Sequence, residues 1–132
     1  MYPGRGRGGG GAGWGRRGPH RARRFLEPTL LLLLAQGDAH GYDLVARLQA
    51  LDVDQPPPDS SMIYRSLRQM EADGLVVSAW DTTGSGPPRR VYCLTPDGRT
   101  ALAWWIEEIR RQIARLQRLL DAYETTSTTS GE

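Results

Sequence analysis

Hydrophobic residues occur along the chain in short blocks, and their spacing changes from one block to the next. From 30 to 35 they follow one another without a polar interruption, which predicts a short, deeply buried helix. Pro28 suits the first turn of this helix, and Gly37 is expected to end it. From 42 to 51 a second helix is predicted, with three apolar residues on its inner face: Val45, Leu48 and Leu51.

A third helix is predicted after the three prolines at 56–58, which exclude a continuation of the second. Asp59 or Ser60 can cap its start, and Gly74 is a favourable residue just past its end. One face is an apolar stripe of Ile63, Leu67 and Met70. The opposite face carries Ser61, Arg65, Arg68 and Ala72, with Tyr64 and Gln69 at its margins. Such side chains can bond base edges or phosphates, so this face either contacts DNA or is an ordinary solvated surface.

Two runs typical of β-strands follow, at 75–80 and 89–94. The polar residues between them, rich in Gly and Pro, predict a hairpin. A capping Thr, a Pro and an Asp at 95–97 then predict the start of a last helix, which is expected to reach about Tyr123. The expected fold is mainly α with a small β-hairpin. Three helices and a hairpin over 25–95 have the layout of a winged helix-turn-helix, whose third helix enters the DNA major groove.

The last helix, expected over 96–123, has apolar residues spaced alternately by four and three positions: Leu102, Ile106, Ile109, Ile113, Leu116, Leu120 and Tyr123. This heptad seam predicts that two copies of the chain pair along the helix, with Trp105 beside the seam taking part. The alternative is that the seam packs back onto its own domain. The polar residues at 124–132 are expected to form a disordered tail.

Charge is distributed unevenly along the chain. Residues 1–24 contain seven Arg and no acidic residue, whereas residues 25–132 contain ten Arg and 15 acidic residues. A segment of charge +7 therefore precedes a body of charge −5. The first segment also contains nine Gly and has no hydrophobic period, so it is expected to be a disordered arm. Its Arg-Gly composition is typical of RNA-binding segments.

The arm ends in a sequence that resembles an export signal, because Arg23 and Arg24 precede a run of leucines. Glu27 and Pro28 interrupt the apolar stretch and leave only residues 30–35. An export signal needs roughly 7–15 apolar residues and a membrane span needs roughly 20. A cytoplasmic protein that does not associate with membranes is therefore expected.

The chain offers few residues for metal or catalytic chemistry. Its single Cys excludes an intramolecular disulfide, and His20, His40 and Cys93 lack the spacing of metal ligands. Cys93 alternates with Tyr92 and Leu94, so it is expected to point away from the packed face of the hairpin as a bystander rather than a redox sensor. No Ser, His and acidic residues are spaced as a catalytic unit. We expect neither an enzyme nor a cofactor.

Several motifs resemble the PadR family of bacterial transcriptional regulators. They are HGYDL at 40–44, IYRSL at 63–67, MEADGLV at 70–76, RRVY at 89–92 and LTPDG at 94–98, the last before a long helix. The resemblance covers about residues 25–123 in the same order and leaves the arm outside.

The resemblance implies a homodimeric regulator, a repressor by default, that binds a pseudo-palindromic operator in double-stranded DNA and dimerises through the last helix. By position it places DNA contacts on Ser60, Ser61, Tyr64, Arg65, Arg68, Gly86, Arg89 and Arg90. In the drug-sensing branch of the family a Trp of the last helix stacks on planar compounds, and that position here is Ile109. Trp104 and Trp105 are accordingly expected to pack in the core and the interface. A small-molecule effector stays open as a partner.

Three functions stay open on the sequence: a DNA-binding regulator, an RNA-binding protein that uses the arm, and a protein-interaction module that keeps the winged fold. Residues 25–95 carry five Arg against nine acidic residues, which favours the third function. Four of those five Arg lie on the third helix or the hairpin, which favours the first.

Overall fold

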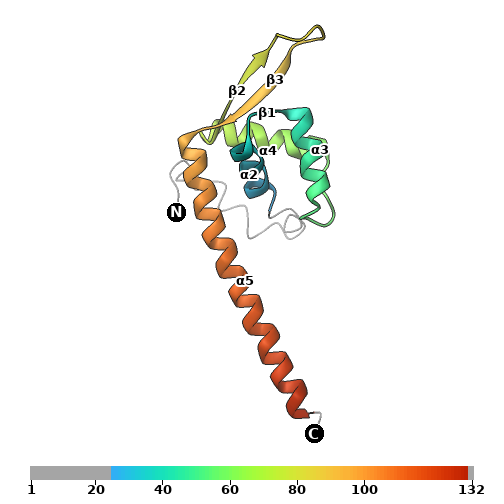
Figure 1. Cartoon of the computed structure of the whole chain (residues 1–132), viewed down its shortest axis with the longest axis vertical. Coiled ribbons are helices and arrows are strands. Elements are labelled where there is room, and N and C mark those ends of the chain that lie inside the picture. Colours follow the sequence, from blue (N-terminus) through green and yellow to red (C-terminus); the bar gives the residue numbers. More distant parts are fainter. Residues whose placement is uncertain (1–24, 131–132) are drawn as a thin grey trace.

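The computed structural model describes residues 25–130, and the arm predicted at 1–24 lies outside these residues. The elements are α2 (Leu26–Gln36), β1 (Ala39–His40), α3 (Gly41–Leu51), α4 (Ser60–Ala72), β2 (Val76–Asp81), β3 (Arg89–Leu94) and α5 (Pro96–Ser130). The three short helices form one body, from which the β2–β3 hairpin and α5 extend in opposite directions (Figure 1). The predicted order of three helices, a hairpin and a long helix is therefore confirmed.

Helix α2 forms the centre of the core because most of its side chains are buried. It contacts α3, α4 and α5, and residues from each helix of the body are fully or almost fully buried: Leu30, Leu31, Leu34, Leu44, Leu48, Ile63, Leu67 and Met70. The apolar stripe predicted for α4 is confirmed. The inner face predicted for α3 is partly wrong, because Leu44 and Leu48 point inward whereas Leu51 is 46% exposed.

The sheet has three antiparallel strands in the order β1–β3–β2. The predicted hairpin is confirmed, with its first strand one residue later at both ends than expected. Strand β1 was not predicted, because two residues are too few to show the alternation of a strand. It pairs Ala39 with Tyr92 and His40 with Val91, and so ties the start of α3 to the hairpin.

Short-range hydrogen bonds fix both ends of α4. An Oδ1 atom of Asp59 accepts a hydrogen bond from the Met62 amide at 2.9 Å, so Asp59 is the N-cap. After the helix, Gly74 adopts a φ of +80°, which favours glycine, and the Leu75 amide donates to the Met70 carbonyl at 2.9 Å. Strand β2 therefore begins directly after the turn that ends α4.

The start of α5 is bound to the same turn. The hydroxyl of Thr95 donates to the Gly74 carbonyl at 2.7 Å and accepts from the Gly98 amide at 3.0 Å. The Thr95 amide donates to the Leu75 carbonyl at 3.1 Å. Thr95 therefore caps α5 and also fastens it to the turn between α4 and β2.

Helix α5 is longer than predicted. Its Trp105 donates from Nε1 to Oε2 of Glu27 at 3.2 Å, which anchors its first part to α2. The helix then continues past the predicted end at Tyr123 to Ser130. The prediction of a disordered tail over 124–132 is wrong as far as Ser130, because a helix that is already long adds one backbone hydrogen bond for each further residue, even where Thr and Ser have a low helix propensity.

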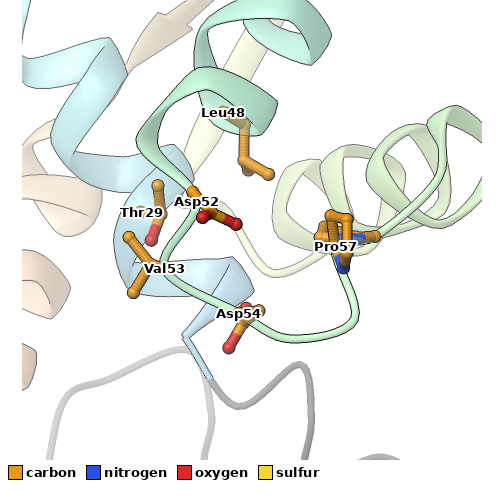
Figure 2. A pocket seen from close by; sticks show the side chains of 7 residues that line it. Thr29, Leu48, Asp52, Val53, Asp54 and Pro57 are labelled. Atoms are coloured by element: carbon orange, nitrogen blue, oxygen red, sulfur yellow. The ribbon is translucent and has the colours of Figure 1, made fainter.

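The loop between α3 and α4 folds back over the start of α2 (Figure 2). It brings the buried carboxylate of Asp54 to the Phe25 amide, with 3.4 Å between Oδ1 and N. The hydroxyl of the buried Thr29 donates to the Phe25 carbonyl at 2.6 Å. Both bonds hold Phe25, the residue directly before α2, in place. Around them lies a small pocket lined by Thr29, Leu48, Asp52, Val53, Asp54, Pro57 and Pro58.

Candidate nucleic-acid interface

Helix α4 presents the predicted polar face to solvent. Its side chains Ser60, Ser61, Arg65 and Arg68 are exposed, on the side opposite the buried stripe. Neither Arg65 nor Arg68 forms an ion pair with another residue between 25 and 130. Both guanidinium groups can therefore bond phosphates or base edges without first breaking an internal ion pair.

Tyr64, at the margin of this face, is partly buried against the start of α3. A Cβ atom at Gly41 would lie 2.6 Å from Cε1 of Tyr64, so the ring packs this closely only because residue 41 is glycine. Gly41 is the first residue of α3, and the contact sets the approach of α3 to α4. Tyr64 thus has a packing role in addition to the DNA contact predicted for it.

One face of the hairpin adjoins α4. The register places Ser78 opposite Tyr92 and Trp80 opposite Arg90, and alternate positions of a strand share one face. Tyr92, near the body, is buried, whereas Trp80, further out, is 62% exposed. The Cζ atom of Arg90 lies 4.9 Å from the centroid of the Trp80 ring, as in a cation–π contact.

A groove separates α4 from this face of the hairpin. It is lined by Tyr64, Arg68 and Glu71 of α4 and by Arg90 and Tyr92 of β3, and we call it the hairpin groove. The Ser78 hydroxyl lies 3.0 and 2.9 Å from the two carboxylate oxygens of Glu71. The same Oγ accepts a hydrogen bond from Nε of Arg90 at 3.0 Å. Burial raises the pKa of the Tyr92 phenol above its ordinary value.

The other face of the hairpin is tied to α3. Nε2 of His40 lies 3.1 Å from Oδ2 of Asp81, and Nδ1 of the same ring lies 3.5 Å from Oδ2 of Asp43. Asp81 also accepts from the Thr83 hydroxyl at 2.7 Å and from the Thr83 amide at 3.0 Å. The Thr83 bonds, followed by the bond to His40, lower the pKa of Asp81 to about 2. His40 thus links the hairpin to α3 through its side chain.

The predicted DNA-contact residues fall into two neighbouring groups. Those of α4 are Ser60, Ser61, Tyr64, Arg65 and Arg68, and those of the hairpin are Gly86, Arg89 and Arg90. Arg89 is exposed, pairs with Asp81 in the strand register, and forms no ion pair with another described residue. Gly86 lies in the loop at the tip of the hairpin. The structure therefore places four arginines on two adjoining elements, with Arg68 and Arg90 on opposite walls of the hairpin groove.

Helix α5 divides into an anchored half and an exposed half. In the first half Leu102, Trp104 and Trp105 pack partly against the core, with the two indoles in an edge-to-face contact at 5.3 Å and 82°. Ile106 and Ile109 are also partly buried. In the second half the predicted seam is open, with Ile113, Leu116, Leu120 and Tyr123 each more than half exposed. The predicted core packing of Trp104 and Trp105 is thus confirmed, and the interface stays a prediction.

The structure gives little support to a reactive Cys93 thiol or to a metal site within residues 25–130. Burial, followed by the neighbouring carboxylate of Asp38, raises the pKa of the Cys93 thiol, which disfavours the reactive thiolate. Among residues 25–130 no three His, Cys, Asp or Glu side chains are grouped as a metal site. The helices of the same region lack either the length or the apolar character needed to cross a membrane.

The three-helix body, the close packing of α3 on α4 and the projecting hairpin define a winged helix-turn-helix protein. The model of the "Transcriptional regulator PadR-like family" matches residues 30–104. The chain belongs to this family, whose members are transcriptional regulators rather than enzymes. The resemblance found in its motifs is confirmed.

A curated relative agrees with this assignment. The chain is 28% identical over 112 residues to "Transcriptional regulator YqjI" of Escherichia coli K12, which covers 82% of this chain and 50% of that protein. It therefore spans about half the length of the curated relatives it matches.

Solved structures are also similar. A conserved protein of unknown function, described as a potential transcriptional factor, is 33% identical with a TM-score of 0.70, over 77% of this chain and 90% of that one. PadR of Bacillus subtilis, solved in complex with operator DNA, is 25% identical with a TM-score of 0.56, over 63% of this chain and 47% of that one.

The sequence did not single out Glu71 and Ser78 as functional residues. The alternation of side chains along β2 places Ser78 and Trp80 on one face, and this can be read from the sequence alone. The partnership of Ser78 with Arg90 depends on the strand register, which the long loop between β2 and β3 leaves open. The contact with Glu71 depends further on how α4 packs on the hairpin.

Proposed function

We propose that the chain is a sequence-specific DNA-binding transcriptional regulator that places α4 in the major groove and the hairpin along the adjoining backbone. The observation that carries this proposal is the set of exposed arginines on α4 and the hairpin, Arg65, Arg68, Arg89 and Arg90. These four residues lie in a region, 25–95, with a net charge of −4, so most of the positive charge of this acidic region is on α4 and the hairpin. The Bacillus subtilis relative was solved in complex with operator DNA, which supports DNA binding as the function of this chain.

We infer that the active form is a homodimer that pairs through the seam of α5. Its second half carries four large apolar seam residues that are more than half exposed: Ile113, Leu116, Leu120 and Tyr123. Leu119 adds a fifth exposed apolar side chain. Pairing would remove these side chains from water and give two copies of α4 for a pseudo-palindromic operator.

The regulatory output that we propose is repression in the cytoplasm, relieved by a small-molecule effector. The resemblance of its motifs to the PadR family, to which the chain belongs, implies repression by default. The first half of α5 differs from that of drug-sensing members, because the position of their stacking Trp is Ile109. An effector for this protein would therefore be bound without that stacking contact.

A titration with three nucleic acids tests the proposal. Labelled duplex from the protein's own promoter, random duplex of equal length and single-stranded RNA are bound at several salt concentrations. The proposal expects the promoter duplex to bind tightest, by at least about 1000-fold over random duplex. Preference for RNA would support an RNA-binding function of the arm, and absence of binding to all three would support a protein-interaction module.

A further inference from the structure

Glu71, Ser78 and Arg90 form a hydrogen-bonded chain that crosses the hairpin groove from α4 to β3. Ser78 is its middle member, with its Oγ 2.9 and 3.0 Å from the Glu71 carboxylate and 3.0 Å from Nε of Arg90. Glu71 and Ser78 are partly buried, whereas Arg90 is exposed. This series of hydrogen bonds therefore runs from the packed part of the fold to its surface.

The chemistry of the three groups fixes the direction of every hydrogen bond. An ionised carboxylate only accepts and a guanidinium only donates, whereas a hydroxyl has one proton and two lone pairs. Ser78 must therefore donate to Glu71, and this leaves a lone pair of its oxygen for Nε–H of Arg90. Without Glu71 the Ser78 hydroxyl could rotate, and its lone pair would no longer be held toward Nε–H of Arg90.

Two constraints then hold the guanidinium group of Arg90. Its Nε–H is bonded to Ser78, and its Cζ lies 4.9 Å from the centre of the exposed Trp80 ring. Four of its five N–H donors remain on the two terminal nitrogens. Arg68 stands on the other wall of the hairpin groove and has no ion-pair partner among the described residues.

We propose that Ser78 and Glu71 are positioning residues for DNA binding, which orient Arg90 so that it and Arg68 hold one backbone phosphate across the hairpin groove. Holding Arg90 in place before binding reduces the rotamer entropy that the side chain loses in the complex. This inference rests on the proposed function, because it assigns residues to the same DNA-binding face.

A double-mutant cycle on promoter duplex tests the inference. Arg90→Ala is expected to weaken binding about tenfold and to reduce the salt slope, by at most about 0.9 for each of the two phosphates that the proposed dimer would hold in this way. Ser78→Ala is expected to weaken binding roughly threefold to fivefold, and Ser78→Thr, which keeps the hydroxyl, to restore it. In the Arg90→Ala background, Ser78→Ala should have no further effect, because it acts only through Arg90. Thr100→Ala, which removes an exposed hydroxyl on α5, serves as the matched control.

A second readout follows the free protein by NMR. The Nε–H of Arg90 should exchange slowly with solvent in the wild type and faster in Ser78→Ala and Glu71→Ala. Equal weakening by Ser78→Ala with and without Arg90 would overturn the inference and show a merely structural role. Fast exchange in the wild type would also overturn it. If the wild type bound no duplex at all, the proposed function would fail as well, so the two failures are distinguishable.

Discussion

Gly98 has no room for a side chain, because the first turn of α5 packs on the turn that follows α4. A Cβ atom at this position would collide with the carbonyl oxygen of Leu75 and lie 2.5 Å from Cδ1 of Leu94. The Leu75 carbonyl already accepts a hydrogen bond from the Thr95 amide, so it cannot move away freely. We predict that Gly98→Ala lowers the free energy of unfolding by about 1–3 kcal/mol, measured by urea denaturation at fixed protein concentration.

Gly84→Ala is the matched control for this prediction. No atom lies within 4 Å of a Cβ built at Gly84, which is in the exposed loop of the hairpin. The free energy of unfolding should change by less than about 0.5 kcal/mol. Similar losses for the two variants would show that the close packing at Gly98 does not limit stability.

Asp81 titrates unusually because the Thr83 hydroxyl bonds its charged form. We predict that Thr83→Ala raises the pKa of Asp81 from about 2 toward the ordinary value of 3.8, whereas Thr83→Ser keeps it low. The folded form has the lower pKa, so the stabilisation is complete above the unfolded pKa of 3.8 and is lost as the pH falls toward 2. Carboxyl NMR titration measures the pKa, and acid unfolding over the same pH range should begin at higher pH in Thr83→Ala. Identical titration curves for the Ala and Ser variants would contradict the prediction.

At the scale of elements, the sequence predicts best where local signals agree with tertiary packing. In α4 the Asp59 cap, the apolar stripe and Gly74 all indicate the same helix, and the structure confirms each of them. Strand β1 and the inner face of α3 could not be predicted in this way. β1 exists only because β3 offers a partner edge, and α3 is oriented by its packing on α2 and α4.

The exposed half of α5 is the element with the clearest unfilled packing surface. Leu116 and Leu120 are 54% and 53% exposed and lie one helical turn apart on the seam. We predict that Leu116→Glu combined with Leu120→Glu raises the dimer dissociation constant at least about 100-fold, because burial of each Leu contributes about 1.5–3 kcal/mol and each copy of the chain loses two. Sedimentation equilibrium measures the constant.

Gln117→Glu is the control for this prediction. Gln117 is exposed between the two leucines but off the seam, where it bonds Asp121 at 2.9 Å. The variant adds a negative charge without removing an apolar side chain, so the dissociation constant should stay within about threefold. A wild type that is monomeric at micromolar concentration would contradict the pairing of α5 altogether.

At the scale of the whole molecule, the sequence identifies the basic face but not how it is organised. Arg65 and Arg68 follow from the helical period, and Arg90 follows from its place beside the hairpin loop. The hydrogen bonds that connect Glu71 through Ser78 to Arg90 depend on strand register and on the docking of α4 against β2. Such long-range geometry has no local sequence signal.

The charge of the whole chain leads to the last prediction, which concerns the arm at 1–24. The arm carries +7 and joins the body directly before α2, so a dimer would add 14 positive charges to an acidic pair of bodies. We predict that deletion of residues 1–24 weakens binding to promoter duplex and flattens its salt dependence, by about 0.9 in slope for each phosphate that the arm neutralises in the full-length protein. The preference for promoter over random duplex should stay within about twofold, because bonds to phosphates carry no direct sequence information.

Binding measured by fluorescence anisotropy at several salt concentrations checks the prediction for the arm. A full-length variant with its seven arm arginines replaced by glutamine separates charge from length, and it should match the deletion in both affinity and slope. An unchanged slope in both variants would show that the arm does not contact the duplex. Loss of promoter preference in the deletion would instead assign base recognition to the arm, as in the minor-groove arms of homeodomains, and would leave α4 with a smaller share of specificity than its exposed arginines indicate.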